Sequence, residues 1–418
     1  MAVFYNLFLL LFRLGIYVSA IWNKKTRLWI QGRHEIIPRI KNTLQGNSNP
    51  LVWVHCASLG EFEQGREIIE RIKKTYPHYT VLLTFFSPSG YEIRKNYKGA
   101  DWVFYLPLDG ASASEKFLDI VKPTFAIFVK YESWHYYLKG LQKRNIPAFL
   151  ICAVFTPNLS FFGPFGFFLR TMLDKYTHIF VQDKSSKDLL EKYQIKAPIS
   201  IGGDTRFDRV VEISNEPFQD AIIESFCNEN TIVAGSTWED DEELLEALYH
   251  QNQNIKLLIA PHEINEQHLT AIEKRFPDAA RFTHVVKGHP AEGRVLIVDT
   301  IGMLSKLYRY GLCAYVGGGF NKTGIHNILE AAVYGKVVFF GPTHWLSREA
   351  IALIEIKAAY SCTNKEEFCE KFVHAISNED QLKIKNKMAK EYVLAHKGAT
   401  DQLIHHFEGK RLLTKASN

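Results

Sequence analysis

Several short motifs in this chain of 418 residues combine small residues with a side chain that could do chemistry. The first is His55-Cys-Ala-Ser-Leu-Gly-Glu61-Phe62, where a buried-strand pattern ends and a helical pattern begins. Ser58 and Gly60 suit a tight turn whose amides can face an anion. Glu61 falls in the first helical turn, where the helix dipole favours a carboxylate. Two interpretations stay open, a glutamate that only caps a helix and a general base beside a ligand.

Two further motifs in the first half carry a charged side chain directly after an apolar segment. Glu132 lies in Lys130-Tyr-Glu-Ser-Trp134, which follows a strand pattern over residues 125–129. Arg206 lies in Gly202-Gly-Asp-Thr-Arg-Phe-Asp208, a glycine-rich turn in which an arginine could clamp a phosphate or a carboxylate. A purely structural carboxylate and a surface salt bridge are the alternatives for these two residues.

A fourth motif, Gly235-Ser-Thr-Trp-Glu239, opens the second half of the chain. Ser236 and Thr237 are small residues that lead from a strand into a helix, a setting that can cradle a phosphate. The acidic run over residues 239–243 could hold a metal or could simply give the helix a favourably charged first turn. Because the sequence holds no Asp-x-Asp triplet, we expect no metal site and no cofactor.

The most specific motif is Tyr315-Val-Gly-Gly-Gly-Phe320, followed by Gly324-Ile-His-Asn-Ile-Leu-Glu330. A strand runs into three glycines, a loop and then a helix, which is the layout of a nucleotide-binding turn. Asn327 and Glu330 share a helix face, so together they could reach a nucleotide's phosphate and ribose hydroxyls. A glycine loop that serves only packing is the alternative.

The elements that must position these motifs alternate between short apolar runs and helical patterns, which is typical of parallel α/β sheets. Two such series in tandem predict an α/β protein of GT-B architecture, with two Rossmann-like domains that face each other across a cleft. We expect residues 34–207 to form the first domain, residues 208–218 a linker, and residues 219–418 the nucleotide-sugar domain. Ligands of such sheets bind at the carboxyl ends of the strands, where all of these motifs lie. The predicted strands cover residues 50–55, 80–85, 102–106, 125–129, 148–153, 178–181, 231–235, 256–260, 295–298, 313–316 and 337–340.

The N-terminal segment, residues 1–33, contains an apolar run over residues 3–22 that is interrupted only by Arg13. A helix of about 20 residues could just cross a hydrocarbon layer of about 30 Å, although an arginine near its middle is costly there. Basic residues follow at Lys24, Lys25 and Arg27, and the positive-inside rule would keep them in the cytoplasm. The segment is therefore interpreted as a membrane anchor, with an interfacial helix and a buried core helix as alternatives.

Composition excludes some classes of function. A net charge of +5 is too small to indicate a nucleic-acid-binding protein, although it suits anionic partners such as phosphates or lipid head groups. The 6 cysteines form no Cys-x-x-Cys pair, as expected for reduced, mostly buried thiols.

Taken together, the motifs resemble those of the Kdo (3-deoxy-D-manno-octulosonate) transferases, glycosyltransferase family 30, over almost the whole chain. The resemblance rests on Ser58-Leu-Gly-Glu61, Glu132-Ser-Trp134, Gly203-Asp-Thr-Arg-Phe-Asp208, Gly235-Ser-Thr237, Asp299-Thr-Ile-Gly302, Gly317-Gly318 and Asn327-Ile-Leu-Glu330. The family's Ala-Pro-Arg-His-Pro-Glu is represented by Ala260-Pro-His-Glu263, which lacks the arginine, and Arg206 replaces a lysine.

The resemblance implies a role for each group of matching residues. Glu61 would deprotonate a hydroxyl of the acceptor, and Glu132 and Arg206 would stabilise charge in the transition state. Ser58 and Gly60 would contact the acceptor. The CMP-linked donor would be held by Ser236, Thr237, Pro261, His262, Gly302, Met303, Leu304, Asn327, Ile328, Leu329 and Glu330.

The implied reaction transfers Kdo from CMP-Kdo to a lipid A precursor, with inversion at the anomeric carbon and without a metal. The implied partners are this donor, this acceptor and inner-membrane lipid, with the catalytic domains on the cytoplasmic face of the inner membrane. Another GT-B nucleotide-sugar transferase or an epimerase is the alternative. A non-catalytic lipid-binding protein on the same scaffold is a third hypothesis.

Overall fold

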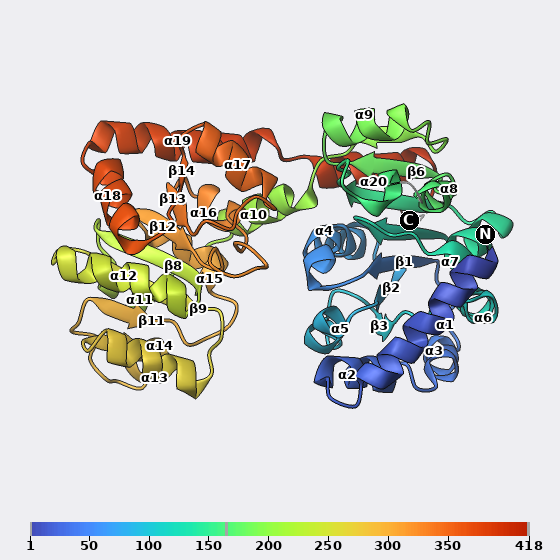
Figure 1. Ribbon diagram of the computed structural model, residues 1–418, viewed down its shortest axis with the longest axis horizontal. Coiled ribbons are helices and arrows are strands. Elements are labelled where there is room, and N and C mark those ends of the chain that lie inside the picture. The colour runs from blue at the N-terminus through green and yellow to red at the C-terminus, as the bar shows by residue number, and fades with distance from the viewer. Residues whose placement is uncertain (1, 164–165, 416–418) are drawn as a thin grey trace. The chain divides into compact units, whose positions relative to one another are not determined.

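The computed structural model describes residues 2–163 and 166–415 and divides the chain into two compact units (Figure 1). Unit 1 contains the described residues up to Asp208 together with those from Gly398 onward, and unit 2 contains Arg209–Lys397. Met1 and the last three residues of the chain, which fall within the predicted domains, lie outside the described residues. Each unit is an α/β sheet of its own, so the predicted fold class is confirmed.

Unit 1 is built on a seven-stranded parallel sheet with the order β3-β2-β1-β4-β5-β6-β7. Its strands are fully buried along most of their length because helices cover both faces, as parallel sheets require. The strands are β1 (Leu51–Cys56), β2 (Thr80–Phe85), β3 (Trp102–Tyr105), β4 (Phe125–Val129), β5 (Ala148–Ala153), β6 (His178–Val181) and β7 (Ile199–Ile201). The helices are α1 (Ala2–Ser19), α2 (Lys24–Gly32), α3 (Ile36–Leu44), α4 (Leu59–Thr75), α5 (Pro88–Arg94), α6 (Ala111–Val121), α7 (His135–Lys143), α8 (Phe167–Leu173), α9 (Lys184–Lys192) and α20 (Ala399–Gly409).

Unit 2 repeats this layout with the strand order β10-β11-β9-β8-β12-β13-β14, again all parallel. The strands are β8 (Thr231–Thr237), β9 (Lys256–Pro261), β10 (Ala279–Arg281), β11 (Val295–Ile297), β12 (Cys313–Val316), β13 (Val338–Phe340) and β14 (Ala359–Ser361). The helices are α11 (Ala221–Phe226), α12 (Glu239–Gln251), α13 (Glu266–Arg275), α14 (Phe282–Val286), α15 (Leu304–Leu307), α16 (Leu329–Ala332), α17 (Arg348–Glu355), α18 (Lys365–Ile376) and α19 (Glu379–Ala395).

The join between the units differs from the predicted linker over residues 208–218. Helix α10 (Thr205–Asn215) runs through the boundary, because its sequence TRFDRVVEISN has no helix-breaking residue before Asn215. Residues 398–418 were expected in the second domain, and their described part belongs instead to unit 1. The reason is apolar packing, since the ring of Phe407 on α20 lies 5.1 Å from that of Phe125 and 4.9 Å from that of Phe149.

Helix α1 packs on unit 1 along one side and exposes apolar residues on the other. Phe12 meets Trp29 and Phe86 at ring distances of 6.1 Å, and the Tyr5 hydroxyl donates to Asp109 Oδ2 at 2.5 Å. Phe4 on the outer side is 77% exposed. Among the helices of the described residues, none is long and apolar enough to cross a membrane.

The packing of α20 leads to a test of unit membership. We expect Phe407→Ala to destabilise unit 1 by about 3–5 kcal/mol, because it leaves a cavity among buried aromatic rings. Urea unfolding read by hydrogen-exchange mass spectrometry reports the two units separately. Phe4→Ala, at an exposed ring, is the control and should change little. Loss of protection in unit 2 instead of unit 1 would contradict the assignment of the C-terminal segment.

Candidate active site

The strand order places the first two motifs next to each other in unit 1. Strand β1 pairs with β2 on one side and with β4 on the other, so the chain's winding direction reverses between β1 and β4. The loops after these two strands carry Glu61 and Glu132. Such a reversal opens a crevice at the carboxyl ends of the strands, where ligands of α/β sheets bind.

Glu61 uses its two carboxylate oxygens differently. Oε2 accepts from the Ser58 backbone N–H at 3.0 Å and from the Ser58 hydroxyl, which completes a capping box at the start of α4. Oε1 lies 3.7 Å from Lys130 Nζ. The helix-capping contact is therefore present, and Oε1 does not take part in it. Gly60 has no close contact at the position of a Cβ, so the turn has room beside it.

Glu132 lies at the end of a row of buried polar side chains. The Trp53 indole N–H donates to Thr84 Oγ1 at 2.8 Å, and the same hydroxyl lies 2.9 Å from Nδ1 of the buried His55. An arrangement in which the Thr84 hydroxyl donates to Nδ1 places the imidazole proton on Nε2, which is 3.5 Å from Glu132 Oε2. The indole of Trp134 donates to that carboxylate as well. Glu132 is only 5% exposed and is held by these neighbours.

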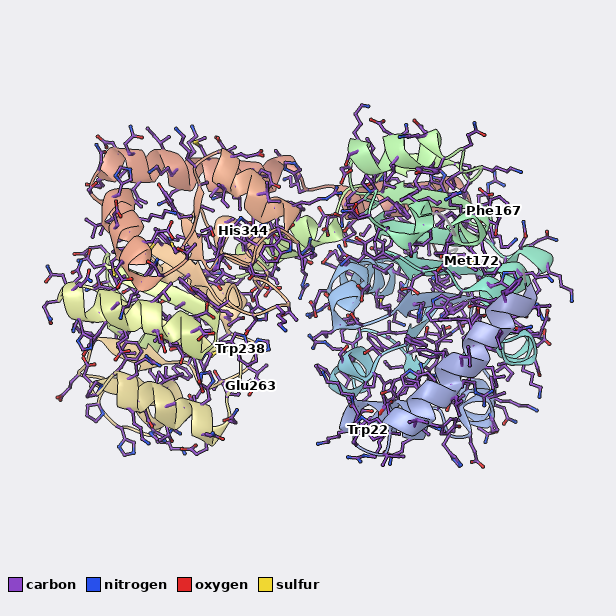
Figure 2. All side chains as sticks on the ribbon, viewed as in Figure 1. Trp22, Phe167, Met172, Trp238, Glu263 and His344 are labelled. Atoms are coloured by element: carbon purple, nitrogen blue, oxygen red, sulfur yellow. The ribbon has the colours of Figure 1, made fainter. Side chains whose placement is uncertain are left out.

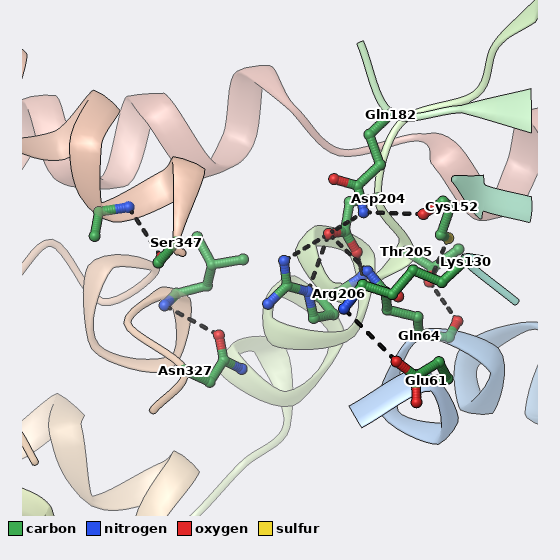
Figure 3. Close-up of polar contacts among 12 residues, drawn as sticks. Glu61, Gln64, Lys130, Cys152, Gln182, Asp204, Thr205, Arg206, Asn327 and Ser347 are labelled. Atoms are coloured by element: carbon green, nitrogen blue, oxygen red, sulfur yellow. Dashed lines mark hydrogen bonds and ion pairs between the residues drawn. The ribbon is translucent and has the colours of Figure 1, made fainter. Parts of the chain in front are cut away.

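Arg206 is held within its own turn (Figure 3). Its Nε and Nη2 donate to Asp204 Oδ2 at 3.0 and 2.7 Å, and Gln64 and Gln182 donate to the same oxygen. Burial alone would raise the pKa of Asp204, but the guanidinium and these amides outweigh it and hold the pKa below its ordinary value. Because Gln64 lies on α4 one turn after Glu61, this network ties the arginine turn to the helix that presents Glu61.

In unit 2, β8 and β12 flank the equivalent reversal of the sheet. Ser236 adopts a left-handed conformation with φ of 55° at the end of β8. Thr237 is fully buried, and its hydroxyl donates to Glu242 Oε1 at 2.9 Å, which in turn pairs with His268 at 3.0 Å. The structure therefore employs the Thr237 side chain internally, and the Thr237 carbonyl oxygen accepts from the His262 backbone N–H at 3.0 Å.

One residue of the acidic run after this turn, Asp241, has a structural role. Asp241 accepts from the backbone N–H groups of Trp238 and Gly318 at 3.0 and 2.9 Å and from the Tyr315 hydroxyl at 2.8 Å. It therefore joins the start of α12 to the glycine loop after β12. Within the described residues, no group of three or more metal-ligating side chains is present.

The glycine loop after β12 is shaped by close backbone approach. A Cβ on Gly317 would lie 2.2 Å from the Ser236 carbonyl oxygen, and one on Gly319 would lie 2.5 Å from the backbone of Gly341. The packing interpretation therefore holds for these two glycines. It also brings the loop against the turn after β8, so both predicted donor motifs of unit 2 lie together.

The Asn327 and Glu330 side chains meet as the spacing predicts, with Asn327 Nδ2 donating to Glu330 Oε1 at 3.1 Å. Asn327 also accepts from the Leu329 backbone N–H at 3.3 Å, just before the short helix α16. The side chains of Ile328 and Leu329 are fully buried. Neither residue is therefore exposed to a ligand in this structure.

The remaining predicted donor-binding residues lie after β9 and around the start of α15. The His262 ring stacks 4.7 Å from Trp238 and 4.4 Å from His326, directly after the buried Pro261 (Trp238 is labelled in Figure 2). Met303 precedes the single-turn helix α15, which begins at Leu304. Gly302 is exposed with a φ of 94°, a conformation that favours glycine.

The structure thus groups the predicted residues by unit, with Ser58, Gly60, Glu61, Glu132 and Arg206 in unit 1 and the donor set in unit 2. Sequence reasoning missed His55, Gln64 and Lys130 as partners of these residues. His55 could have been found from the sequence, because it is a polar residue inside an otherwise apolar strand. Lys130 lies two residues before the predicted Glu132. Its contact with Glu61 depends on the order of the strands in the sheet, which the sequence does not give.

Comparison with known proteins identifies this arrangement at two levels. At the level of fold, the chain is similar to the UDP-GlcNAc 2-epimerase of Neisseria meningitidis bound to UDP-GlcNAc, at 15% identity, over 85% of this chain and 98% of that one, with a TM-score of 0.59. The MurG structure of Acinetobacter baumannii is similar at 12% identity over 86% and 99% of the two chains, with a TM-score of 0.55. The fold is therefore of the GT-B type.

At the level of family, residues 30–209 match the model of the 3-deoxy-D-manno-octulosonic-acid transferases. The chain is 24% identical to the transferase of this name from Haemophilus influenzae, over 84% of this chain and 85% of that protein, and 26% identical to that of Aquifex aeolicus, over 82% and 90%. A bifunctional glycosyltransferase/methyltransferase of Fusobacterium nucleatum matches at 26% over 78% of this chain, but over only 53% of its own length. The resemblance to the Kdo transferases is thereby confirmed, and the chain is a glycosyltransferase.

The stacking of His262 and His326 in unit 2 predicts a measurable pKa for His326. Burial, followed by the neighbouring His262, lowers the pKa of His326 from 6.5 to about 4, so the folded protein keeps this ring neutral. Its contribution to stability is complete above pH 6.5 and is lost as the pH falls toward 4, because the unfolded chain binds the proton first. An NMR titration of the His326 ring should have its midpoint near pH 4. A midpoint at or above the ordinary value would contradict the desolvated stack.

Proposed function

We propose that this protein transfers Kdo from CMP-Kdo to a lipid A precursor, without a metal and with inversion at the anomeric carbon. The observation that carries the proposal is the divided environment of Glu61. One carboxylate oxygen is fixed by the capping box, and the other is presented beside Lys130 at the crevice between β1 and β4. The similarity to proteins named Kdo transferases supports the choice of sugar.

In the proposed reaction, an acceptor hydroxyl oxygen forms a bond to the anomeric carbon while the bond from that carbon to the CMP phosphate breaks. The hydroxyl proton passes to Glu61 Oε1, and CMP leaves with the electron pair. A positioned base of this kind contributes about 10²–10⁴-fold to the rate. Developing oxocarbenium character makes the fixed carboxylate of Glu132 a suitable electrostatic neighbour.

In the proposed reaction, Arg206 supplies a positive charge that is fixed in place before the ligand binds. Because Asp204 holds two of its nitrogens, the guanidinium cannot swing freely toward a ligand. A fixed cation can still stabilise negative charge on a leaving phosphate, and it pays no reorganisation during the reaction. Lys130 adds a second cation on the same side of the sheet.

The donor is assigned to unit 2 on chemical grounds. The Asn327–Glu330 pair offers both a donor and acceptors to the ribose hydroxyls. The turn after β8 and the loop after β12 offer backbone amides to a phosphate at the sheet reversal. The exposed ring of His262 and the turn from Gly302 to Leu304 complete the proposed set.

We also propose that α1 lies in the membrane interface on the cytoplasmic side of the inner membrane. Its outer side exposes apolar residues, among them Phe4 at 77% and Leu14 at 60%, and Trp22 after its end is 68% exposed (Figure 2). The exposed Lys24 and Lys25 follow directly and suit anionic head groups. A lipid acceptor requires such a location.

The central test replaces Glu61 by glutamine, whose amide oxygen can still accept from Ser58 and keep the start of α4. We expect kcat for Kdo transfer to a tetraacylated lipid A precursor to fall about 10²–10⁴-fold, because the base is lost. Mass spectrometry of the lipid product gives the rate. Glu63→Gln, on the same helix and paired with Arg94, is the matched control and should keep its activity.

Equal rates in the two variants would remove Glu61 from the role of base. The alternative function is tested with UDP-GlcNAc as the substrate, because the fold is also that of UDP-GlcNAc 2-epimerases. Turnover of UDP-GlcNAc without transfer from CMP-Kdo would replace the proposal by an epimerase.

Membrane association has its own test. Leu14→Asp should weaken co-flotation with vesicles of phosphatidylglycerol and phosphatidylethanolamine roughly tenfold, because burying one leucine side chain is worth about 1.5–3 kcal/mol. Val373→Asp, at a valine of α18 that is 53% exposed, is the control and should bind as the wild type does. Equal binding by Leu14→Asp and the wild type would refute the interfacial role of α1.

A further inference from the structure

A groove of about 600 Å³ runs along one flank of α1 in unit 1, beside the side that packs on the domain. One stripe of α1, from Asn6 through Leu10 and Arg13 to Tyr17, forms one wall, and residues of α2 and α3 form the other. The β3–α6 connection over residues 107–113 closes the groove. From Asn6 to Tyr17 a helix rises about 16 Å, so the groove is long and narrow enough for an extended chain.

The walls of the groove are apolar and its charged residues are basic. Leu9, Ile30, Ile36, Ile37 and Leu108 contribute the apolar surface. The basic residues are Arg13, Arg33 and His34, and within the described part of the chain no carboxylate pairs with either arginine. The single acid of the lining, Asp109, is already satisfied by the Tyr5 hydroxyl and by the backbone N–H groups of Tyr136 and Tyr137.

Arg33 shows how the groove holds a positive charge without a counter-ion. Its guanidinium donates to the carbonyl oxygens of Leu106 and Phe86 at 2.9 and 2.8 Å, and it lies 3.8 Å above the Trp29 ring. Burial lowers the pKa of Arg33 to about 9, which leaves it charged at neutral pH. Apolar walls with an uncompensated cation complement a molecule that has a hydrocarbon chain and an anionic group.

The groove is connected to the candidate active site through one aromatic residue. The Phe86 ring lies 5.7 Å from Trp29 in the groove wall and 5.0 Å from Trp134, whose indole binds Glu132. The Phe86 backbone N–H also donates to Ala57, the residue before Ser58. A continuous row of aromatic rings therefore joins the groove wall at Trp29 to the Glu132 side of the candidate site.

We propose that the groove between α1 and α2–α3 binds an acyl chain of the lipid acceptor, with Arg13 and Arg33 facing an anionic group of that lipid. This inference rests on the proposed function and adds the part of the acceptor that unit 1 recognises. It also gives α1 two separate apolar sides, one for the acyl chain and one for the bilayer. A helix that is apolar around most of its circumference has both sides covered in this arrangement.

The test fills the groove without changing the polarity of α1. Leu10 lines the groove and is 62% exposed, so Leu10→Trp adds volume there without disturbing the core. Ile93→Trp, on α5 outside the groove at 59% exposure, is the matched control. Transfer is measured with a tetraacylated disaccharide acceptor and with the same phosphorylated disaccharide after complete deacylation, and vesicle co-flotation is measured for each variant.

We expect Leu10→Trp to raise KM for the acylated acceptor about tenfold, because losing even two buried methylene groups costs that much affinity. KM for the deacylated acceptor and vesicle binding should not change, and Ile93→Trp should behave as the wild type. An equal effect of Leu10→Trp on both acceptors, or no effect on either, would overturn the proposal.

The experiment distinguishes an error in the proposed function from an error in the proposal that the groove binds an acyl chain. If the wild type transfers Kdo to neither acceptor, the function is wrong, and the groove is then judged by calorimetric titration of the full chain with monomeric dodecyl phosphate. Binding by the wild type and by Ile93→Trp, but not by Leu10→Trp, retains a lipid-chain site. Absence of binding by the wild type overturns the groove as well.

Discussion

The structure depends on the reversal of winding direction in each parallel sheet. Because β1 lies between β2 and β4, the loops after β1 and β4 leave the sheet toward opposite faces and open a crevice between them. In unit 1 this constraint brings Glu61, Lys130 and Glu132 to one edge, although they are separated by more than a full βαβ repeat. In unit 2 the same reversal, between β8 and β12, brings the serine turn against the glycine loop.

Within this frame, short hydrogen-bonded networks fix the side chains of the candidate site. The capping box fixes Glu61, the Trp134 indole fixes Glu132, and Asp204 fixes Arg206. Glu132 and Asp204 are buried, where an unmade hydrogen bond is costly and a made one is correspondingly specific. The site is thus preorganised before a ligand arrives, which is the property that electrostatic stabilisation of a transition state requires.

The sequence predicted the parts of the fold that follow from local pattern. Strands β1–β6, β8, β9 and β11–β13 were found because buried parallel strands read as continuous apolar runs. Three short strands were missed, namely β7, β10 and β14, each of only three residues. The C-terminal helix α20 was placed with the wrong unit, since its partners Phe125 and Phe149 lie far away in the chain. Long-range packing of that kind leaves no local signal.

For the site, sequence spacing located the turns but not the use of each side chain. Asn327 and Glu330 form a hydrogen bond, as their spacing predicts. The Thr237 hydroxyl, in contrast, donates to Glu242, and the side chains of Ile328 and Leu329 are buried in the core. The account as a whole is tested most directly by the anomeric configuration of the sugar in the lipid product, determined by NMR. Direct displacement by a hydroxyl that Glu61 deprotonates predicts inversion relative to the CMP-linked donor. Retention of configuration would contradict it.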